Sequence, residues 1–168
     1  TPAAADAWLT ALNLYGTMSF EQVVTPALEL AERGFPIPIA LHQSLASTGD
    51  RLLNDGGDSL RWPTTQEVFF PGGRPLEKGA LLVQQDLART FRRLIEVERD
   101  NSSRGREDAI QAARDYFYTG QIGEEMVRFC QEQGGLLTME DLADFNVGVE
   151  TPAAGSYKGI DVYTCGPW

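Results

Sequence analysis

The stretch DYFYTGQIGEEMVRFCQEQGGLLTMEDLADF, residues 115–145, carries the clearest secondary-structure signals of this sequence. Gly120 is expected to end one helix, and a second helix is predicted over about 122–133, because apolar residues recur there at helical spacing. The residues of that apolar face are Ile122, Met126, Phe129 and Cys130. Gly134 and Gly135 predict the end of this helix, since glycine adopts the left-handed conformation that commonly closes one.

A capping box is predicted where the same stretch becomes helical again. Thr138 precedes a short helix, and Asp141 lies three residues later. The threonine oxygen can accept a hydrogen bond from a backbone N–H of the first turn, and the carboxylate can accept one from the backbone of Thr138. The stretch therefore predicts a helix, a double-glycine stop and a capped restart.

Length and charge limit the class of protein. The 168 residues suffice for one domain or for a piece of a larger one, and a hydrophobic content of 42% predicts a globular chain. The net charge of −10 argues against binding to nucleic acid or to anionic membranes, because both require clustered cations. No apolar run is long enough to span a bilayer, and no signal peptide is visible.

The first part of the chain is predicted to be helical. A helix is expected over 3–15, with one buried apolar face formed by Trp8, Ala11, Leu12 and Tyr15. Ser19 and Gln22 predict a capping box before a short helical turn. Thr25-Pro26 then predicts a fresh helix start, because proline is tolerated at the first helical position, and Gly34 is expected to end that helix.

The middle of the chain is predicted to alternate helices with polar connections. A helix reaching about Leu53 is followed by a loop at 54–59 and a turn at 71–75. A further helix over 85–98 precedes a flexible polar loop at 99–107 and a helix that ends near Phe117. The apolar positions that predict these three helices are Ile37, Leu41 and Leu45, then Leu87, Phe91, Leu94 and Ile95, then Ile110, Ala113 and Phe117. The opposite face of the 85–98 helix, predicted to be solvated, carries Arg89, Arg92 and Arg93.

The end of the chain changes to a period of two, which is typical of strands. Val147 and Val149 predict one strand, Ile160 and Val162 predict a second, and residues 151–159 are expected to join them. The predicted fold class is mainly α with a C-terminal β-strand pair, divided into a helical region 1–145 and a strand pair 146–168. Since a lone strand pair is barely stable in water, its sheet partners are expected beyond this chain, and an exposed apolar patch is expected where they pack.

Few residues are suited to catalysis. His42 is the sole histidine, and no Ser or Cys lies in a nucleophile motif such as G-x-S-x-G, so His42 is interpreted as structural. Cys130 lies on an apolar helix face and is expected to be buried. Neither Cys130 nor Cys165 has a second Cys or His at ligand spacing, so no metal site is predicted, while a disulfide between the two stays open.

The paired carboxylates and paired glycines also have structural interpretations. Glu124-Glu125 and Glu140-Asp141 lie in the first turns of predicted helices, where negative charge is favourable. Gly56-Gly57, Gly72-Gly73 and Gly134-Gly135 lack the G-x-x-x-x-G-K pattern of a phosphate loop. No catalytic, cofactor-binding or metal-ligating residue is therefore assigned.

Five segments, in this order, resemble the large subunit of γ-glutamyltranspeptidases. They are LNLYGTMSFEQVVTPALELAERGF (12–35), PLEKGALLVQQDLART (75–90), FYTGQIGEEMV (117–127), GGLLTMEDLADF (134–145) and GSYKGIDVYTCGP (155–167). Each alone is ordinary helix or strand sequence, whereas five in the family's order cover most of the chain. The sequence is therefore similar to an internal piece of that subunit.

The resemblance implies a fragment of an N-terminal-nucleophile hydrolase, whose fold is a four-layer αββα sandwich. Enzymes of that family cleave their own precursor into large and small subunits, and the new N-terminal threonine of the small subunit is the nucleophile, with its own α-amine as base. They transfer γ-glutamyl groups of glutathione-type amides to water or an amino acid, with no cofactor. By resemblance, the parent is periplasmic or extracellular, although a cytoplasmic location stays open, and the segment's partner is the small subunit.

The resemblance transfers no catalytic residue to this chain. The family's nucleophile is expected downstream of residue 168 and its carboxylate-binding arginine upstream of Thr1, so the segment alone is predicted to be inactive. Thr1-Pro2 does not resemble the family's Thr-Thr-His start, so Thr1 is not taken as the nucleophile. The sequence CGPW at 165–168 replaces the family's prolines and Ser-Ser-Gly-Gly, and the loop at 99–107 is longer than usual. Both departures bear on glutathione specificity more than on the fold.

Two alternatives stay open. In the first alternative, the parent is a related acylase or amidase of the same superfamily, acting on a glutaryl-type or other acyl amide. Otherwise the chain is a non-catalytic helical module that binds a partner protein, which predicts a monomer with no sheet edge left unpaired.

Overall fold

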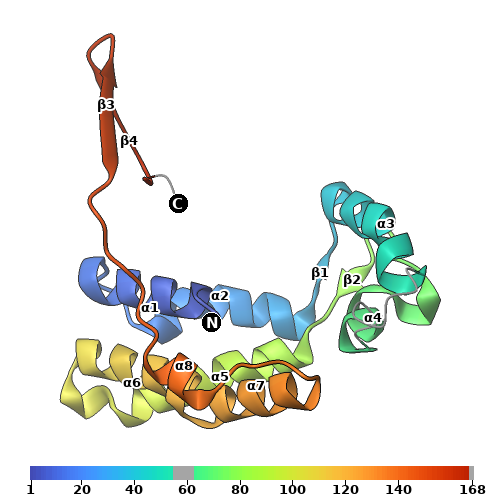
Figure 1. The fold of residues 1–168 in the computed structure, drawn as a ribbon, viewed down its shortest axis with the longest axis horizontal. Helices are drawn as coiled ribbons and strands as arrows, with labels where there is room; N and C mark the ends of the chain where they lie inside the picture. Colours follow the sequence, from blue (N-terminus) through green and yellow to red (C-terminus); the bar gives the residue numbers. More distant parts are fainter. Residues whose placement is uncertain (55–62, 167–168) are drawn as a thin grey trace.

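The chain folds into a layered helical body that carries a small helical lobe at one end and a β-hairpin at the other (Figure 1). This computed structural model describes residues 1–54 and 63–166. The helices are α1 Ala4–Tyr15, α2 Phe20–Arg33, α3 Ile39–Asn54, α4 Pro63–Phe69, α5 Gln85–Asp100, α6 Arg106–Thr119, α7 Gln121–Glu132 and α8 Met139–Ala143, with 3-10 turns η2 Pro71–Gly73 and η3 Ser102–Arg104. The strands are β1 Phe35–Pro36, β2 Leu81–Leu82, β3 Ala153–Tyr157 and β4 Ile160–Thr164. The predicted class, mainly α with a C-terminal strand pair, is confirmed.

Helix α6 forms the centre of the helical body. It packs against α1, α5, α7 and α8, while α2 packs against α5. The small side chains of Ala109 and Ala113 are almost fully buried and let the neighbouring helices approach closely. At the far end of α6, Tyr118, Val127 and Leu142 form a buried cluster that joins α6 to α7 and α8. No helix of the described residues is long and apolar enough to cross a membrane.

The predicted helix 3–15 is α1, but its predicted buried face is wrong. Trp8 and Tyr15 are 71% and 75% exposed, whereas Asp6 and Leu9 are buried. Helix α1 has apolar residues on more than one side, and hydrogen bonds between Asp6 and residues of α6 determine which side faces the body. The face that carries Trp8 and Tyr15 is left uncovered within the described residues.

Helix α2 runs continuously through Thr25 and Pro26, so the predicted restart there is wrong. The capping box of Ser19 and Gln22 is confirmed. The Thr25 hydroxyl donates to the Glu21 carbonyl at 2.7 Å, inside the helix. Proline removes only one N–H donor, and the well-capped N-terminus keeps both sides of it in one helix. Gly34, with φ of +81°, ends α2 as predicted.

Residues 99–107 are not the predicted flexible loop. Helix α5 continues to Asp100, the side chain of Asn101 donates to the Val97 carbonyl at 2.9 Å, and η3 follows. The Arg106 guanidinium then donates to the carbonyls of Leu12 and Asn13 at the C-terminus of α1. The Leu12 carbonyl also accepts the Gly16 N–H, while the bond to the Asn13 carbonyl pairs a group at the open end of α1, so the polar composition serves capping.

On α5, Leu94 and Ile95 are buried as predicted, while Leu87 is partly exposed. Arg89 and Arg93 pair along the helix surface with Asp86 and Glu96, as expected for a solvated face. Arg92 differs, because it reaches across to Glu32 of α2.

The lobe consists of α3, α4 and η2. It joins the body through the short antiparallel pair β1–β2, which was not predicted from the sequence. Its core consists of Ile37, Leu45, Phe70 and Leu82. Ile37 precedes α3 rather than lying within it, and η2 lies in the predicted turn 71–75. Of the predicted loop 54–59, Asn54 still belongs to α3, and the rest lies outside the described residues.

Helix α7 lies where predicted, although its buried positions are Gly123 and Val127, and Phe129 is half exposed. A glycine is required at position 123, because the backbone of Tyr118 lies so near that a Cβ there would be 2.1 Å from the Tyr118 carbonyl oxygen. The glycine stop is confirmed, with Gly134 at φ of +79°. The capping box of Thr138 and Asp141 is confirmed as well.

The strand pair exists, but its predicted first strand is wrong. Residues 147–149 are not a strand, and β3 occupies part of the predicted connection 151–159. Lys158 and Gly159 both have positive φ and form a two-residue turn, which pairs Tyr157 with Ile160. That turn, rather than the valine alternation, sets the register. Every residue of β3 and β4 is exposed, and the hairpin stands away from the helices (Figure 1).

Candidate functional site: a buried ion-pair cluster

The most buried charged cluster of the described residues centres on Asp6 of α1 and Arg114 of α6. Their side chains are 1% and 11% exposed, and Arg114 Nε lies 2.5 Å from Asp6 Oδ1. A buried charge is tolerated only when paired and hydrogen-bonded, because removal from water is costly. The pair is therefore a strong constraint on how α1 sits on α6.

The remaining hydrogen-bonding capacity of Asp6 is also used. Oδ1 accepts a bond from the Thr10 hydroxyl at 3.1 Å, and Oδ2 accepts one from the Val147 N–H at 2.7 Å. The backbone N–H of Asp6 donates to the Tyr118 hydroxyl oxygen at 3.0 Å. One aspartate thus joins α1, α6 and the segment that follows α8.

Arg114 extends the cluster toward that same segment. Its Nη2 donates to the Phe145 carbonyl at 2.6 Å and to Asn146 Oδ1 at 3.1 Å. Its guanidinium lies over the Tyr118 ring, 5.1 Å from the centroid. The planar, forked donor set of arginine allows these contacts at one time.

Tyr118 completes the cluster, and its side chain is fully buried. Its hydroxyl donates to the Pro2 carbonyl at 2.6 Å while accepting the Asp6 N–H. Its ring stacks on Phe145 at a centroid distance of 5.9 Å. The phenol therefore fixes the N-terminal residues and the chain after α8 against one another.

The charges of the cluster are stable near neutral pH. Burial alone would raise the pKa of Asp6, but hydrogen bonds from Arg114 and the Val147 N–H outweigh it and hold that pKa below its ordinary value. Burial raises the pKa of Tyr118, so the phenol keeps its proton. The donors and acceptors around Asp6 are already engaged, so this cluster is suited to holding structure rather than to nucleophilic or acid–base chemistry.

The structure places the sequence's candidate reactive residues in separate elements. His42, on α3, is half-buried, and its Nδ1 lies 2.8 Å from the Leu76 carbonyl oxygen. Cys130 and Cys165 are both free thiols, and Cys130 is half-buried rather than fully buried. Thr1 Oγ1 donates to the Asp141 carbonyl at 3.4 Å. Among the residues described, no group of three or more His, Cys, Asp or Glu side chains could hold a metal ion.

The paired carboxylates bind neighbours within the chain. Glu125 pairs with Arg128 on α7, and the hydrogen bond from that arginine lowers the pKa of Glu125. Asp141 accepts bonds from both the N–H and the hydroxyl of Thr138 at 2.8 Å. Of the glycine pairs, Gly72 and Gly73 lie in η2, Gly134 and Gly135 follow α7, and Gly56-Gly57 lies outside the described residues.

A hollow of about 460 Å³ lies between the lobe and the start of α5. Its lining is mainly aliphatic, with Glu67 and Asp86 as its ionisable residues. None of its lining residues is a serine, cysteine or histidine. Its lining therefore offers no thiol or imidazole, and its one hydroxyl side chain is that of Thr64.

Asp6 and Arg114 were not predicted from the sequence. One signal for Arg114 was available, since it lies four residues after Ile110 and three before Phe117, on the apolar face of its helix. A charge on such a face requires a buried partner. The identity of that partner depends on a contact across 108 positions, which periodicity does not contain.

Comparison with known proteins gives a consistent result. The family described as Gamma-glutamyltranspeptidase matches residues 1–168. The "Glutathione hydrolase proenzyme" of Escherichia coli is 34% identical over 167 residues, covering 99% of this chain and 25% of that protein. The "Acylase ACY 1 proenzyme" of a Pseudomonas species is 31% identical, covering 96% of this chain and 25% of that protein. The chain spans about a quarter of the length of these curated relatives.

A solved structure agrees with the sequence matches. The γ-glutamyltranspeptidase of Helicobacter pylori superposes with a TM-score of 0.79 at 28% identity. The match covers 99% of this chain and 42% of that one. The arrangement of helices, lobe and hairpin is thus found within a larger enzyme chain.

Proposed function

Because this chain belongs to the gamma-glutamyltranspeptidase family, we propose that it is a framework piece of an enzyme that transfers or hydrolyses γ-glutamyl groups of glutathione-type amides. The observation that carries the proposal is the family match over all 168 residues, together with 34% identity to a glutathione hydrolase proenzyme. In this proposal the catalytic threonine lies on polypeptide outside residues 1–168.

The hairpin supports a division of labour within the chain. Residues 1–145 form the helical region, and residues 146–168 supply a strand pair to the central sheet of the parent. All ten residues of β3 and β4 are exposed, including Tyr157 and Val162. An isolated two-stranded hairpin is marginal in water, so a larger sheet would supply the missing pairing and burial.

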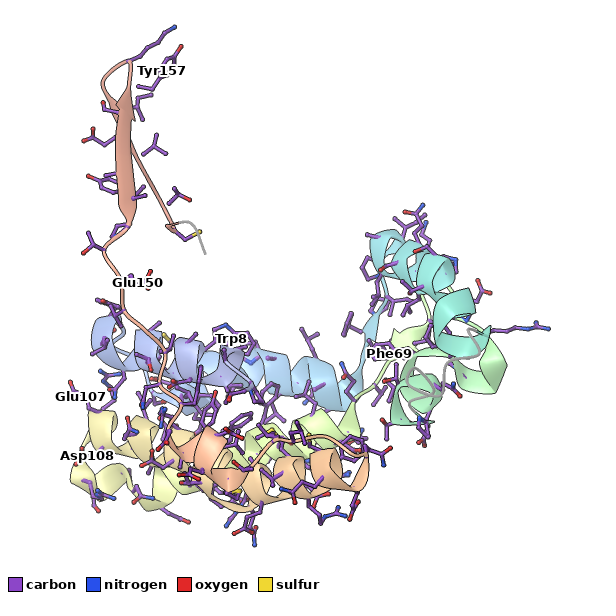
Figure 2. All side chains as sticks on the ribbon, in the orientation of Figure 1. Trp8, Phe69, Glu107, Asp108, Glu150 and Tyr157 are labelled. Carbon is purple, nitrogen blue, oxygen red and sulfur yellow. The ribbon has the colours of Figure 1, made fainter. Side chains whose placement is uncertain are left out.

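The uncovered face of the helical body supports the remainder of the precursor as the partner. Trp8 and Tyr15 of α1 are more than two-thirds exposed, and Val23 and Leu30 of α2 are about half exposed. Figure 2 shows Trp8 on the α1–α2 side of the body, away from α6 and α7. An apolar surface of this kind marks an interaction site, and the parts of the relatives that this chain does not span would cover it.

Hydrolysis of another acyl amide is the second candidate activity, and it is supported by similarity to an acylase. The acylase relative is 31% identical to this chain, close to the 34% of the glutathione hydrolase relative. A parent that hydrolyses another acyl amide is therefore the alternative substrate class. By contrast, the hypothesis of a free-standing helical module predicted no unpaired sheet edge, whereas among the described residues β3 and β4 pair only with each other.

The test is to express the full-length gene product and to follow its self-cleavage on a denaturing gel. The purified protein is then given a chromogenic γ-glutamyl anilide and, in parallel, a glutaryl amide. We expect two subunits and release of the amine from the γ-glutamyl substrate. Preference for the glutaryl amide would replace the proposal with the acylase alternative. Absence of both cleavage and turnover would refute the enzyme proposal, and residues 1–168 alone, the matched control, are expected to show no turnover.

A further inference from the structure

Three consecutive residues of the connection from α8 to β3 are held by one ion pair. Arg114 binds the carbonyl of Phe145 and the side chain of Asn146, and Asp6 binds the N–H of Val147. The two charged residues come from α6 and α1, far away in the sequence. The connection is therefore fixed from two helices at once.

Beyond Val147 the chain leaves the helical body. Among the described residues before the hairpin, Val147 is the last to form a hydrogen bond with the helical body. Residues 148–164 are all exposed. Figure 2 shows Glu150 on the segment that leaves the body and Tyr157 near the tip of the hairpin. The point at which the chain leaves the helical body is thus fixed at residues 145–147.

We propose that Arg114, seated by Asp6 and Tyr118, is a positioning residue for self-cleavage of the precursor. It holds residues 145–147 so that the hairpin enters the parent's sheet in one register. This inference rests on the proposed function, because it requires a precursor that cleaves itself. Arg114 acts through the hairpin and has no part in the bond that is broken.

The geometry explains why this position needs arginine. Nε donates to Asp6 while Nη2 donates to Phe145 and Asn146, from one rigid plane. A lysine would keep the charge beside Asp6, but its single ammonium on a flexible stem cannot reproduce the planar fork. The Arg114→Lys variant therefore keeps a positive charge beside Asp6 but removes the hydrogen bonds to Phe145 and Asn146.

The experiment uses the full-length protein with Arg114→Lys, Arg114→Met and the control Arg128→Lys. Arg128 is also a paired arginine, but it lies on the exposed surface of α7, and its ion pairs within the described residues are with Glu125 and Glu132 of the same helix. Amide hydrogen exchange measured by mass spectrometry covers residues 145–152 and the helices separately. The time course of self-cleavage is measured on the same preparations.

For Arg114→Lys we expect exchange in the peptide 145–152 to rise about tenfold at the Val147 amide, which donates to Asp6, with the helices little changed. Loss of the bonds to Phe145 and Asn146 loosens the segment that presents this amide. Self-cleavage is expected to slow several-fold in parallel. Arg128→Lys is expected to match the wild type in both measurements. Arg114→Met leaves Asp6 buried without its counter-charge and is expected to raise exchange throughout α1 and α6 as well.

Several outcomes would overturn the inference. Unchanged exchange at 145–152 in Arg114→Lys would show that Arg114 does not hold the connection. Faster exchange spread evenly over all helices would show a general stabilising role instead, and faster local exchange with normal cleavage would remove the link to processing. A wild-type protein that does not cleave itself would refute the proposed function. That failure is seen before any variant is compared, so it is distinct from failure of this inference. If Arg114→Met does not accumulate, Arg114→Lys still decides the question.

Discussion

Glu98 Oε1 accepts a hydrogen bond from the backbone N–H of Phe20 at 2.6 Å, so a buried carboxylate of α5 closes the N-terminus of α2. Its Oε2 accepts the next N–H, that of Glu21, at 2.8 Å. The Ser19 hydroxyl takes the N–H of Gln22. Three N–H groups in the first turn of α2 are thus satisfied, two of them by a carboxylate of another helix, at a helix end where negative charge is favourable.

We predict that Glu98→Ala destabilises the protein by about 2 kcal/mol, because two partly buried N–H groups of α2 lose their acceptor. The control is Glu96→Ala on the same helix, since Glu96 is exposed and, within the described part of the chain, forms its ion pair with Arg93 along the surface. That change is expected to cost less than about 0.5 kcal/mol. Urea denaturation midpoints of the three proteins give the comparison, and equal midpoints for both variants would contradict the capping role of Glu98.

The Asp6–Arg114 pair predicts a defined pH dependence. The folded-state pKa of Asp6 lies below its ordinary value of 3.8, so its contribution to stability is present above that value and is lost as pH falls through the folded pKa. At pH 7 we expect Asp6→Asn to destabilise the protein by about 3 kcal/mol, because the mostly buried Arg114 loses its close partner and keeps only the half-exposed Asp115, 3.5 Å from Nη1, as a counter-charge. The difference between wild type and variant is expected to shrink below about pH 4.

Denaturation midpoints of both proteins between pH 3 and pH 7 test this dependence. The matched control is Asp86→Asn, whose carboxylate is 89% exposed and pairs with Arg89 at the surface. It is expected to leave the midpoint nearly unchanged at every pH. A difference for Asp6→Asn that stays constant across the range would show that ionisation of Asp6 is not what stabilises the cluster.

Local interactions were predictable from the sequence. The capping boxes at Ser19 and Thr138, and the glycine stop at Gly134, each depend on residues within a few positions of one another. Their physics is contained in a short window, so residue type and spacing suffice. The positions of α1, α5, α6 and α7 followed for the same reason, whereas α4 was not predicted.

Long-range contacts account for what the sequence did not reveal. The buried side of α1 depends on Asp6 meeting Arg114 and Val147, at separations of 108 and 141 positions. The valines at 147 and 149 alternate like a strand, yet the Val147 N–H is taken by Asp6, and the turn at Lys158 places the first strand later. Periodicity identifies an apolar face but not which of two faces is covered.

Gly123 predicts a steric effect at the junction of α6 and α7. A methyl group there would lie 2.1 Å from the Tyr118 carbonyl oxygen, and backbone cannot move aside as a flexible side chain can. We expect Gly123→Ala to destabilise the protein by about 2 kcal/mol through strain, although alanine favours helices intrinsically. Gly148→Ala is the control, because no atom lies within 4 Å of a Cβ there. Thermal unfolding of both variants distinguishes strain from a general effect of replacing glycine.

Trp8 predicts a difference between the isolated segment and the full-length protein. In residues 1–168 the Trp8 side chain is 71% exposed, so Trp8→Gln is expected to change stability by less than about 0.5 kcal/mol. If the remainder of the precursor covers this face, the same change in the full-length protein is expected to cost about 2 kcal/mol, because burial of a large apolar side chain is lost. Glu29→Gln on α2 is the control and should be neutral in both. Equal, small effects of Trp8→Gln in both proteins would mean that this face stays in contact with water, and the partner surface proposed for α1 and α2 would have to be abandoned.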